Sequence, residues 1–172
     1  MFFRDRFTAW LESHQPQNPP RLYQPAGFLG APPVGWHLKI GRTTFVYRVP
    51  EDATDVFYIV LIERGGSRRA LHSPFLDLVR LLQLVQRSES GIRWIRGHVE
   101  APRWRPIDAL SPDRILAFYR RYLTAVSQGV DHGVEWYGGD LTAFSWSAEK
   151  RKIRERDSAP QNLELADAHL NR

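Results

Sequence analysis

Residues 58–82 hold the arrangement most suggestive of chemistry, because an apolar segment there leads through Gly65 and Gly66 and two arginines, Arg68 and Arg69, to a helix start. Such an order could build a phosphate cradle, since backbone N–H groups at a helix N-terminus bind anions. A nucleotide P-loop also needs the pattern GxxxxGK[ST], whose lysine meets the phosphates, and ERGGSRRALHSP has no such lysine. A dinucleotide fingerprint needs a third glycine that opens the helix, and the stretch has none. We therefore predict a charged connecting loop rather than a nucleotide site.

The remaining residues predict neither a catalytic nor a metal centre. The chain has no cysteine, which excludes disulfides, thiolate zinc sites and cysteine nucleophiles. Its histidines are scattered without the spacing of an HExxH motif, and no GxSxG elbow is present. Asp131, His132 and Glu135 are close in sequence, but they precede an expected strand, where turn capping is the commoner use. We expect a protein that is not an enzyme and that has no cofactor.

Arginine dominates the charge of the chain. The net charge is +5, and all but three of the 24 basic residues are arginines. Arginine binds carboxylates and phosphates through two hydrogen bonds, stacks on aromatic rings and is enriched at protein interfaces, although a high arginine share can equally reflect genomic base composition. The candidate partner-binding residues are Arg68, Arg69, Arg103, Arg105, Arg120 and Arg121.

Nucleic acid is an alternative partner. The segment 91–106 interleaves arginines with Trp94 and Trp104, a mixture that can neutralise phosphates and stack bases. However, Tyr119 and Tyr122 fall on a helix face that we expect to be buried, and tryptophans in strands usually belong to the core. No helix-turn-helix spacing or RNA-recognition aromatic pattern is present, so nucleic acid ranks below protein as a partner.

The expected elements begin with an amphipathic helix over residues 2–13, followed by an irregular proline-rich stretch over 14–33. Alternating apolar residues predict a strand over 36–40, a two-residue type II′ turn at Gly41-Arg42 and a return strand over 43–49. Residues 56–62 are apolar without interruption, which predicts a central strand that is covered on both faces.

The second half of the chain predicts helices over 73–86 and 111–127, each opened by a Ser-Pro pair. A strand is expected over 91–100, and two short strands, 134–137 and 141–146, should form a hairpin around Gly138 and Gly139. The predicted fold is an α+β two-layer sandwich, with a mainly antiparallel sheet packed by about three helices. Residues 1–146 should form one domain, and residues 147–172 a charged, flexible tail.

Several of these segments resemble the LcrR family of bacterial type III secretion regulators, which is named for the low-calcium response. The resemblance rests on VLIER over residues 60–64, the pair Arg68-Arg69, Pro74-Phe75, Arg114 and FYRRY over residues 118–122. It extends over residues 10–146, and none of its motifs is a chemical signature.

The resemblance implies a cytoplasmic bacterial protein that adjusts type III secretion through contacts with other secretion proteins, such as a regulator, a gatekeeper or a substrate. It supplies no catalytic residues. A chaperone that binds a secreted substrate ranks second, because chaperones of that class are usually acidic whereas this chain is basic. No membrane insertion is expected, since no apolar run approaches spanning length, and a homodimer is left open.

Overall fold

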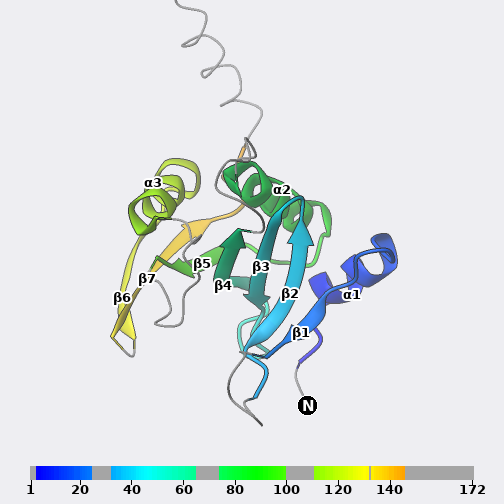
Figure 1. Ribbon diagram of the computed structural model, residues 1–172. Helices are drawn as coiled ribbons and strands as arrows, with labels where there is room; N and C mark the ends of the chain where they lie inside the picture. Colours follow the sequence, from blue (N-terminus) through cyan, green and yellow to red (C-terminus); the bar gives the residue numbers. More distant parts are fainter. Residues whose placement is uncertain (1–2, 25–31, 65–73, 100–110, 132, 146–172) are drawn as a thin grey trace, which may run out of the picture.

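The computed structural model describes residues 3–24, 32–64, 74–99, 111–131 and 133–145. These residues form three helices and seven strands (Figure 1), which in chain order are α1 (Arg6–His14), β1 (Arg21–Tyr23), β2 (Gly35–Ile40), β3 (Thr43–Arg48), β4 (Val56–Arg64), α2 (Pro74–Arg87), β5 (Trp94–His98), α3 (Pro112–Leu123), β6 (Val126–Asp131) and β7 (Val134–Asp140).

The strands form one sheet in the order β1-β2-β3-β4-β5-β7-β6. Only β4 and β5 are parallel, and α2 makes the connection between them. All three helices contribute side chains to a single buried cluster with one face of the sheet, and examples are Phe7 from α1, Leu82 from α2 and Phe118 from α3. The predicted α+β fold with a mainly antiparallel sheet is thereby confirmed.

The predicted hairpin forms with its two-residue turn. The φ of Gly41 is +59°, and Arg42 is not one of the described residues with a positive φ. A type II′ turn requires this combination. A Cβ atom at Gly41 would lie 2.6 Å from Oδ1 of Asp77 on α2. Glycine at this position therefore serves both the turn and the close approach of the helix.

Helix α1 begins at Arg6 rather than at residue 2, because Asp5 caps it. The Asp5 carboxylate accepts hydrogen bonds from Thr8 N–H at 2.9 Å and from Thr8 Oγ1 at 2.7 Å. Thr8 Oγ1 also lies 2.8 Å from Oη of Tyr47 on β3. These buried groups fix α1 to the sheet.

The prediction of a helix over residues 111–127 is wrong at its C-terminal end. Thr124 adopts the left-handed conformation with φ 47° and ψ 35°, and Ala125 N–H donates to the Tyr119 carbonyl oxygen at 3.2 Å. Strand β6 begins two residues later at Val126, whose side chain is 65% exposed.

The prediction of a hairpin that turns at Gly138 and Gly139 is also wrong. Strand β7 runs straight through both glycines, and the chain reverses instead between β6 and β7. A Cβ atom at Gly139 would lie 2.4 Å from the Leu123 carbonyl oxygen, and one at Gly138 would overlap the Gln128 side chain. The two glycines accommodate the end of α3 and a neighbouring strand. Residues 141–145 form no strand.

Strand β4 is central, as predicted, but only one of its faces is fully covered. Phe57, Ile59 and Ile62 are buried under the helices, whereas Tyr58 and Val60 on the other side are half-buried. In the part of the chain that the structure describes, no helix joins this second face. A further strand that we did not predict, β1, lies in the proline-rich stretch and pairs with β2 at one edge of the sheet.

Candidate binding surface between α2 and α3

The described residues contain no group of three or more His, Cys, Asp or Glu side chains that could hold a metal ion. Among the helices of that part of the chain, none is both long and apolar enough to cross a membrane. Of the six arginines predicted to bind a partner, Arg120 and Arg121 lie exposed on α3. Arg68, Arg69, Arg103 and Arg105 lie outside the described residues, as does His132.

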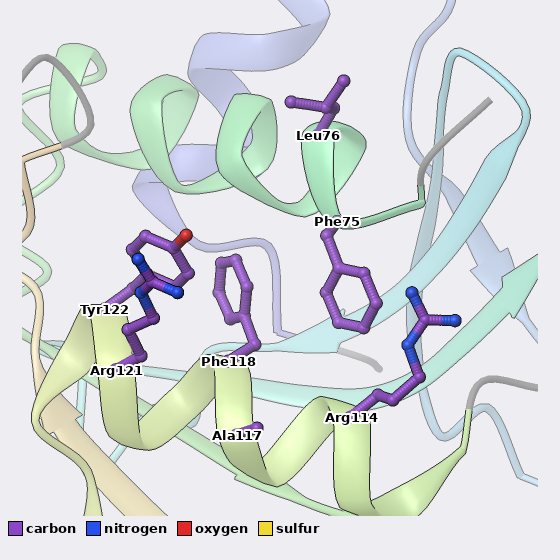
Figure 2. Close-up of a pocket in the computed structure, with 7 residues that line it drawn as sticks. All are labelled: Phe75, Leu76, Arg114, Ala117, Phe118, Arg121 and Tyr122. Carbon is purple, nitrogen blue, oxygen red and sulfur yellow. The ribbon is translucent and has the colours of Figure 1, made fainter. Parts of the chain in front are cut away.

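A pocket opens between the start of α2 and the length of α3, which we call the α2–α3 groove (Figure 2). Its volume is about 370 Å³, and it is lined by Phe75, Leu76, Arg114, Ala117, Phe118, Arg121 and Tyr122. Pockets of roughly 300–1,000 Å³ with apolar and aromatic walls are typical of binding sites.

Aromatic rings from both helices form the wall of the groove. The Phe118 ring lies between its two neighbours, with its centroid 5.6 Å from that of Phe75 and 4.7 Å from that of Tyr122. Figure 2 shows the Phe75 ring reaching from α2 towards α3 beside Phe118. Because the rings support one another across two helices, the groove is preformed.

The local sequence explains why these side chains converge. Pro74 is the first residue of α2, so Phe75 and Leu76 stand in its first turn. On α3, Arg114, Phe118 and Tyr122 recur every four residues and therefore share one helical face. Leu76 is 43% exposed, so an apolar side chain remains accessible at this end of α2.

Two guanidinium groups border the aromatic wall. The guanidinium carbon of Arg114 lies 5.1 Å from the Phe75 ring centroid, and that of Arg121 lies 5.3 Å from the Tyr122 centroid. Cations over aromatic faces are held by the ring quadrupole. The groove thus combines an apolar floor with positively charged edges.

Arg120 and Arg121, both predicted to bind a partner, point to different sides of α3. Arg121 borders the groove, whereas the guanidinium of Arg120 lies 6.0 Å from the Tyr137 ring on β7. Hydrogen bonds from Ser127 and Tyr137 lower the pKa of Glu135, and the positive charge of Arg120 adds to this effect. Arg120 therefore faces the sheet side of α3.

Arg121 was predicted from the sequence as a partner-binding residue, but Arg114, Phe75 and Phe118 were not predicted to share a surface with it. Each was visible as part of a helix face, but the pairing of the two faces depends on how α2 and α3 pack on the sheet. The Ser-Pro pair before each helix was the signal available in the sequence, because it marks the residue at which the helix begins.

A protein-family model described as "Type III secretion system regulator (LcrR)" matches residues 4–151. Searches of curated proteins and of solved structures give no match.

Proposed function

The chain belongs to the LcrR family of type III secretion system regulators, and we propose that it regulates by binding another protein of the secretion system through the α2–α3 groove. The observation that carries this proposal is the aromatic wall between two helices, with Phe118 at its centre. The role that we propose is cytoplasmic and non-catalytic.

The shape of the groove favours an amphipathic segment as the ligand. Helices commonly bind other proteins by laying an apolar face into a groove between two helices. Phe75 and Phe118 would receive the apolar side chains of such a segment, and Leu76 would extend the contact beyond the groove. Rings of this kind dominate binding energy at protein interfaces, because they bury a large area at a small cost in conformational entropy.

The positive charge at the edges of the groove favours a ligand with acidic residues on either side of its apolar anchors. Arg114 and Arg121 are both exposed, and arginine binds carboxylates with two parallel hydrogen bonds. We propose that acidic residues of the partner flank its apolar anchors, which would speed the encounter and fix the orientation. The other predicted arginines remain proposed contacts: Arg68 and Arg69 precede α2 in the sequence, and Arg103 and Arg105 precede α3.

Site-specific cross-linking in a secreting bacterium tests this function. A photoreactive residue at Ala117, which lines the groove and is exposed, should capture a protein of the secretion system. The same residue at Glu51, in the exposed turn between β3 and β4, serves as the control. Capture of the same partner from position 51 but not from position 117 would place the contact elsewhere.

One observation favours the chaperone alternative. Strand β6 is an edge of the sheet, and its Val126 and Val130 are 65% and 70% exposed. An extended substrate segment could add to such an edge by backbone hydrogen bonding. Replacing both valines by lysine would block this addition, so a chaperone would lose its substrate while binding at the groove would be unchanged.

A further inference from the structure

The face of the sheet opposite the helices carries a row of three cross-strand neighbours. Arg48 on β3 is paired with Tyr58 on β4, and Tyr58 is paired with Arg96 on β5. Because directly opposed residues point to the same face, the two arginines stand on either side of the tyrosine. We call this surface, together with Trp94, His98 and Trp136, the open sheet face.

The two guanidinium groups are held in place by the tyrosine. The guanidinium carbons of Arg48 and Arg96 each lie 5.4 Å from the Tyr58 ring centroid. Arg96 Nη1 also donates a 2.7 Å hydrogen bond to Tyr58 Oη, and Arg96 Nε donates to Gln128 Oε1. The glycine opposite Arg96 is Gly138, which leaves room for the Gln128 side chain. Arg96 is therefore oriented before any ligand arrives.

Aromatic rings surround this row. The Trp136 ring lies edge-on to Tyr58 with centroids 5.6 Å apart, and His98 lies edge-on to Trp136 at 5.0 Å. His98 Nε2 donates to the Val60 carbonyl oxygen at 2.9 Å. Two residues before Arg96 on the same face, Trp94 is 46% exposed.

The exposure of Trp94 corrects the expectation that tryptophans in strands belong to the core. In β5 the side chain that enters the core is Ile95, which is 1% exposed, and Trp94 therefore points the opposite way. Nucleic acid ranked below protein as a partner partly because of that expectation.

Neither arginine of the open sheet face forms an ion pair with another described residue. The ion pairs of the described residues join Arg4 to Glu12 and Arg80 to Asp77, and neither involves Arg48 or Arg96. The carboxylate opposite Trp94 belongs to Asp140, which accepts hydrogen bonds from N–H and Oγ1 of Thr142. The face thus offers two fixed cations and an accessible indole in a chain of net charge +5.

We propose that the open sheet face binds single-stranded nucleic acid, with phosphodiester groups at Arg48 and Arg96 and a base stacked on Trp94. A sheet backed by helices on one side and lined with aromatic side chains on the other is a platform on which unpaired bases stack. A duplex keeps its bases stacked inside, so it would use the arginines alone. An acidic protein segment would also use only the arginines and would leave the exposed indole without a role.

The test is fluorescence anisotropy with labelled oligonucleotides of about 16 nucleotides, the upper end of the site sizes of small single-strand binding folds. Single-stranded RNA, single-stranded DNA and the matching DNA duplex are each titrated with the full chain at several salt concentrations. We expect a single strand to bind more tightly than the duplex. Whichever of single-stranded RNA and single-stranded DNA binds with the higher affinity is the preferred nucleic acid. With two phosphates neutralised, the logarithm of the binding constant should fall with the logarithm of salt at a slope of about −1.4.

Three variants locate the site. Trp94→Ala should weaken binding at least about five-fold through the loss of stacking. Arg48→Ala should reduce the magnitude of the salt slope by about 0.7, because one phosphate contact is lost. Arg87→Glu, on the exposed end of α2, removes more positive charge on the helical side and should leave binding unchanged. Thermal melting checks that each variant is folded.

Some results would overturn the proposal. Equal affinity for duplex and single strands, or equal losses in Arg87→Glu and Arg48→Ala, would mean unspecific attraction to the whole basic chain. Complete displacement by polyglutamate at equal charge would assign the face to an acidic protein. No binding at low salt would leave the open sheet face without this ligand. None of these outcomes involves the α2–α3 groove.

Discussion

Thr43 Oγ1 donates a 2.8 Å hydrogen bond to the carboxylate of Asp77, which is 0% exposed. The bond joins the return strand of the hairpin, β3, to the first turn of α2, from which Phe75 enters the groove. The Arg42 backbone N–H, at 3.4 Å, and Arg80 Nη1, at 3.3 Å, also donate to this carboxylate. Asp77 therefore links the sheet to the helix that supplies one wall of the groove.

The substitution Thr43→Val should destabilise the protein by about 1.5–3 kcal/mol, the usual contribution of a hydrogen bond to a charged group. The new side chain has almost the same shape but leaves the buried Asp77 carboxylate with one donor fewer. Thr44→Val, at the next position of the same strand and only half-buried, is the matched control. Denaturant unfolding should show the loss at position 43 alone, and equal midpoints for the two variants would refute this role of Asp77.

The Asp5 cap predicts a specific pH dependence of stability. Burial raises the pKa of Asp5 above 3.8, and its hydrogen bonds from Thr8 offset this only in part. Between the unfolded and folded pKa values the folded state holds the extra proton, so the free energy of unfolding falls as the pH rises through that window. Asp5→Asn keeps a capping side chain but does not titrate.

The free energy of unfolding of the wild type should therefore fall relative to that of Asp5→Asn as the pH rises from the unfolded pKa of Asp5, about 4, to its folded pKa. Above the folded pKa the difference between the two proteins should be constant. NMR titration of the Asp5 carboxyl group gives the folded pKa directly. A gain of the wild type over the variant with rising pH would mean that the folded pKa is depressed, contrary to this account.

Gly97 and Tyr119 should be energetically coupled. A Cβ atom at Gly97 would lie 2.4 Å from Tyr119 Oη, and this buried hydroxyl has no hydrogen-bond partner among the described residues. Gly97→Ala alone should cost about 1–3 kcal/mol through overpacking, while Tyr119→Phe should be neutral or stabilising because it removes an unsatisfied polar group.

The double variant should recover part of the loss, with a coupling energy of about 0.5–3 kcal/mol in a double-mutant cycle. Thermal or denaturant unfolding of the four proteins measures it. Strict additivity would show that the alanine is accommodated by a shift of β5 rather than against the Tyr119 hydroxyl.

The charged segment over residues 147–172 should be dispensable for folding, since its sequence offers too little apolar area to offset the entropy of ordering. The last described residues are already anchored, because Gln86 Nε2 donates to the carbonyl oxygens of Leu141 and Phe144, each at 2.9 Å. A chain that ends at residue 146 should keep the melting temperature of the full chain within about 2 °C, a shift that corresponds to less than about 1 kcal/mol. A larger drop would show that the segment docks on the domain.

Local signals predicted much of the fold. The hairpin with its Gly41 turn, the central place of β4 and the start of α2 at Pro74 all follow from patterns within a few residues. The failures depend on tertiary contacts. Two adjacent glycines such as Gly138 and Gly139 are typical of a turn. In the structure they lie within β7, where the absence of side chains lets Leu123 and Gln128 approach the strand. Helix α3 ends at a left-handed Thr124, a position at which the sequence offers no glycine.

The surfaces were harder to predict than the fold. The α2–α3 groove needs Phe75 and Phe118, which are 43 positions apart in the sequence, to stack across two helices. The open sheet face depends on register, because Arg48, Tyr58 and Arg96 become neighbours only when three strands are aligned. Alternation identified strand positions, but not which face of β5 the helices would cover.

The most direct test of the central claim is secretion control by the double variant Arg114→Glu and Ala117→Glu in a bacterium that lacks the wild-type chain. Both positions are exposed on α3, and a carboxylate at position 114, in the first turn of the helix, is favourable, so the melting temperature should be nearly unchanged. Charge reversal at the groove edge and a carboxylate beside its floor should weaken partner binding at least about ten-fold, because like charges would then face each other across the interface. We predict loss of regulated secretion with a folded protein, while Arg87→Glu regulates normally. Normal secretion control by the folded double variant would contradict the account.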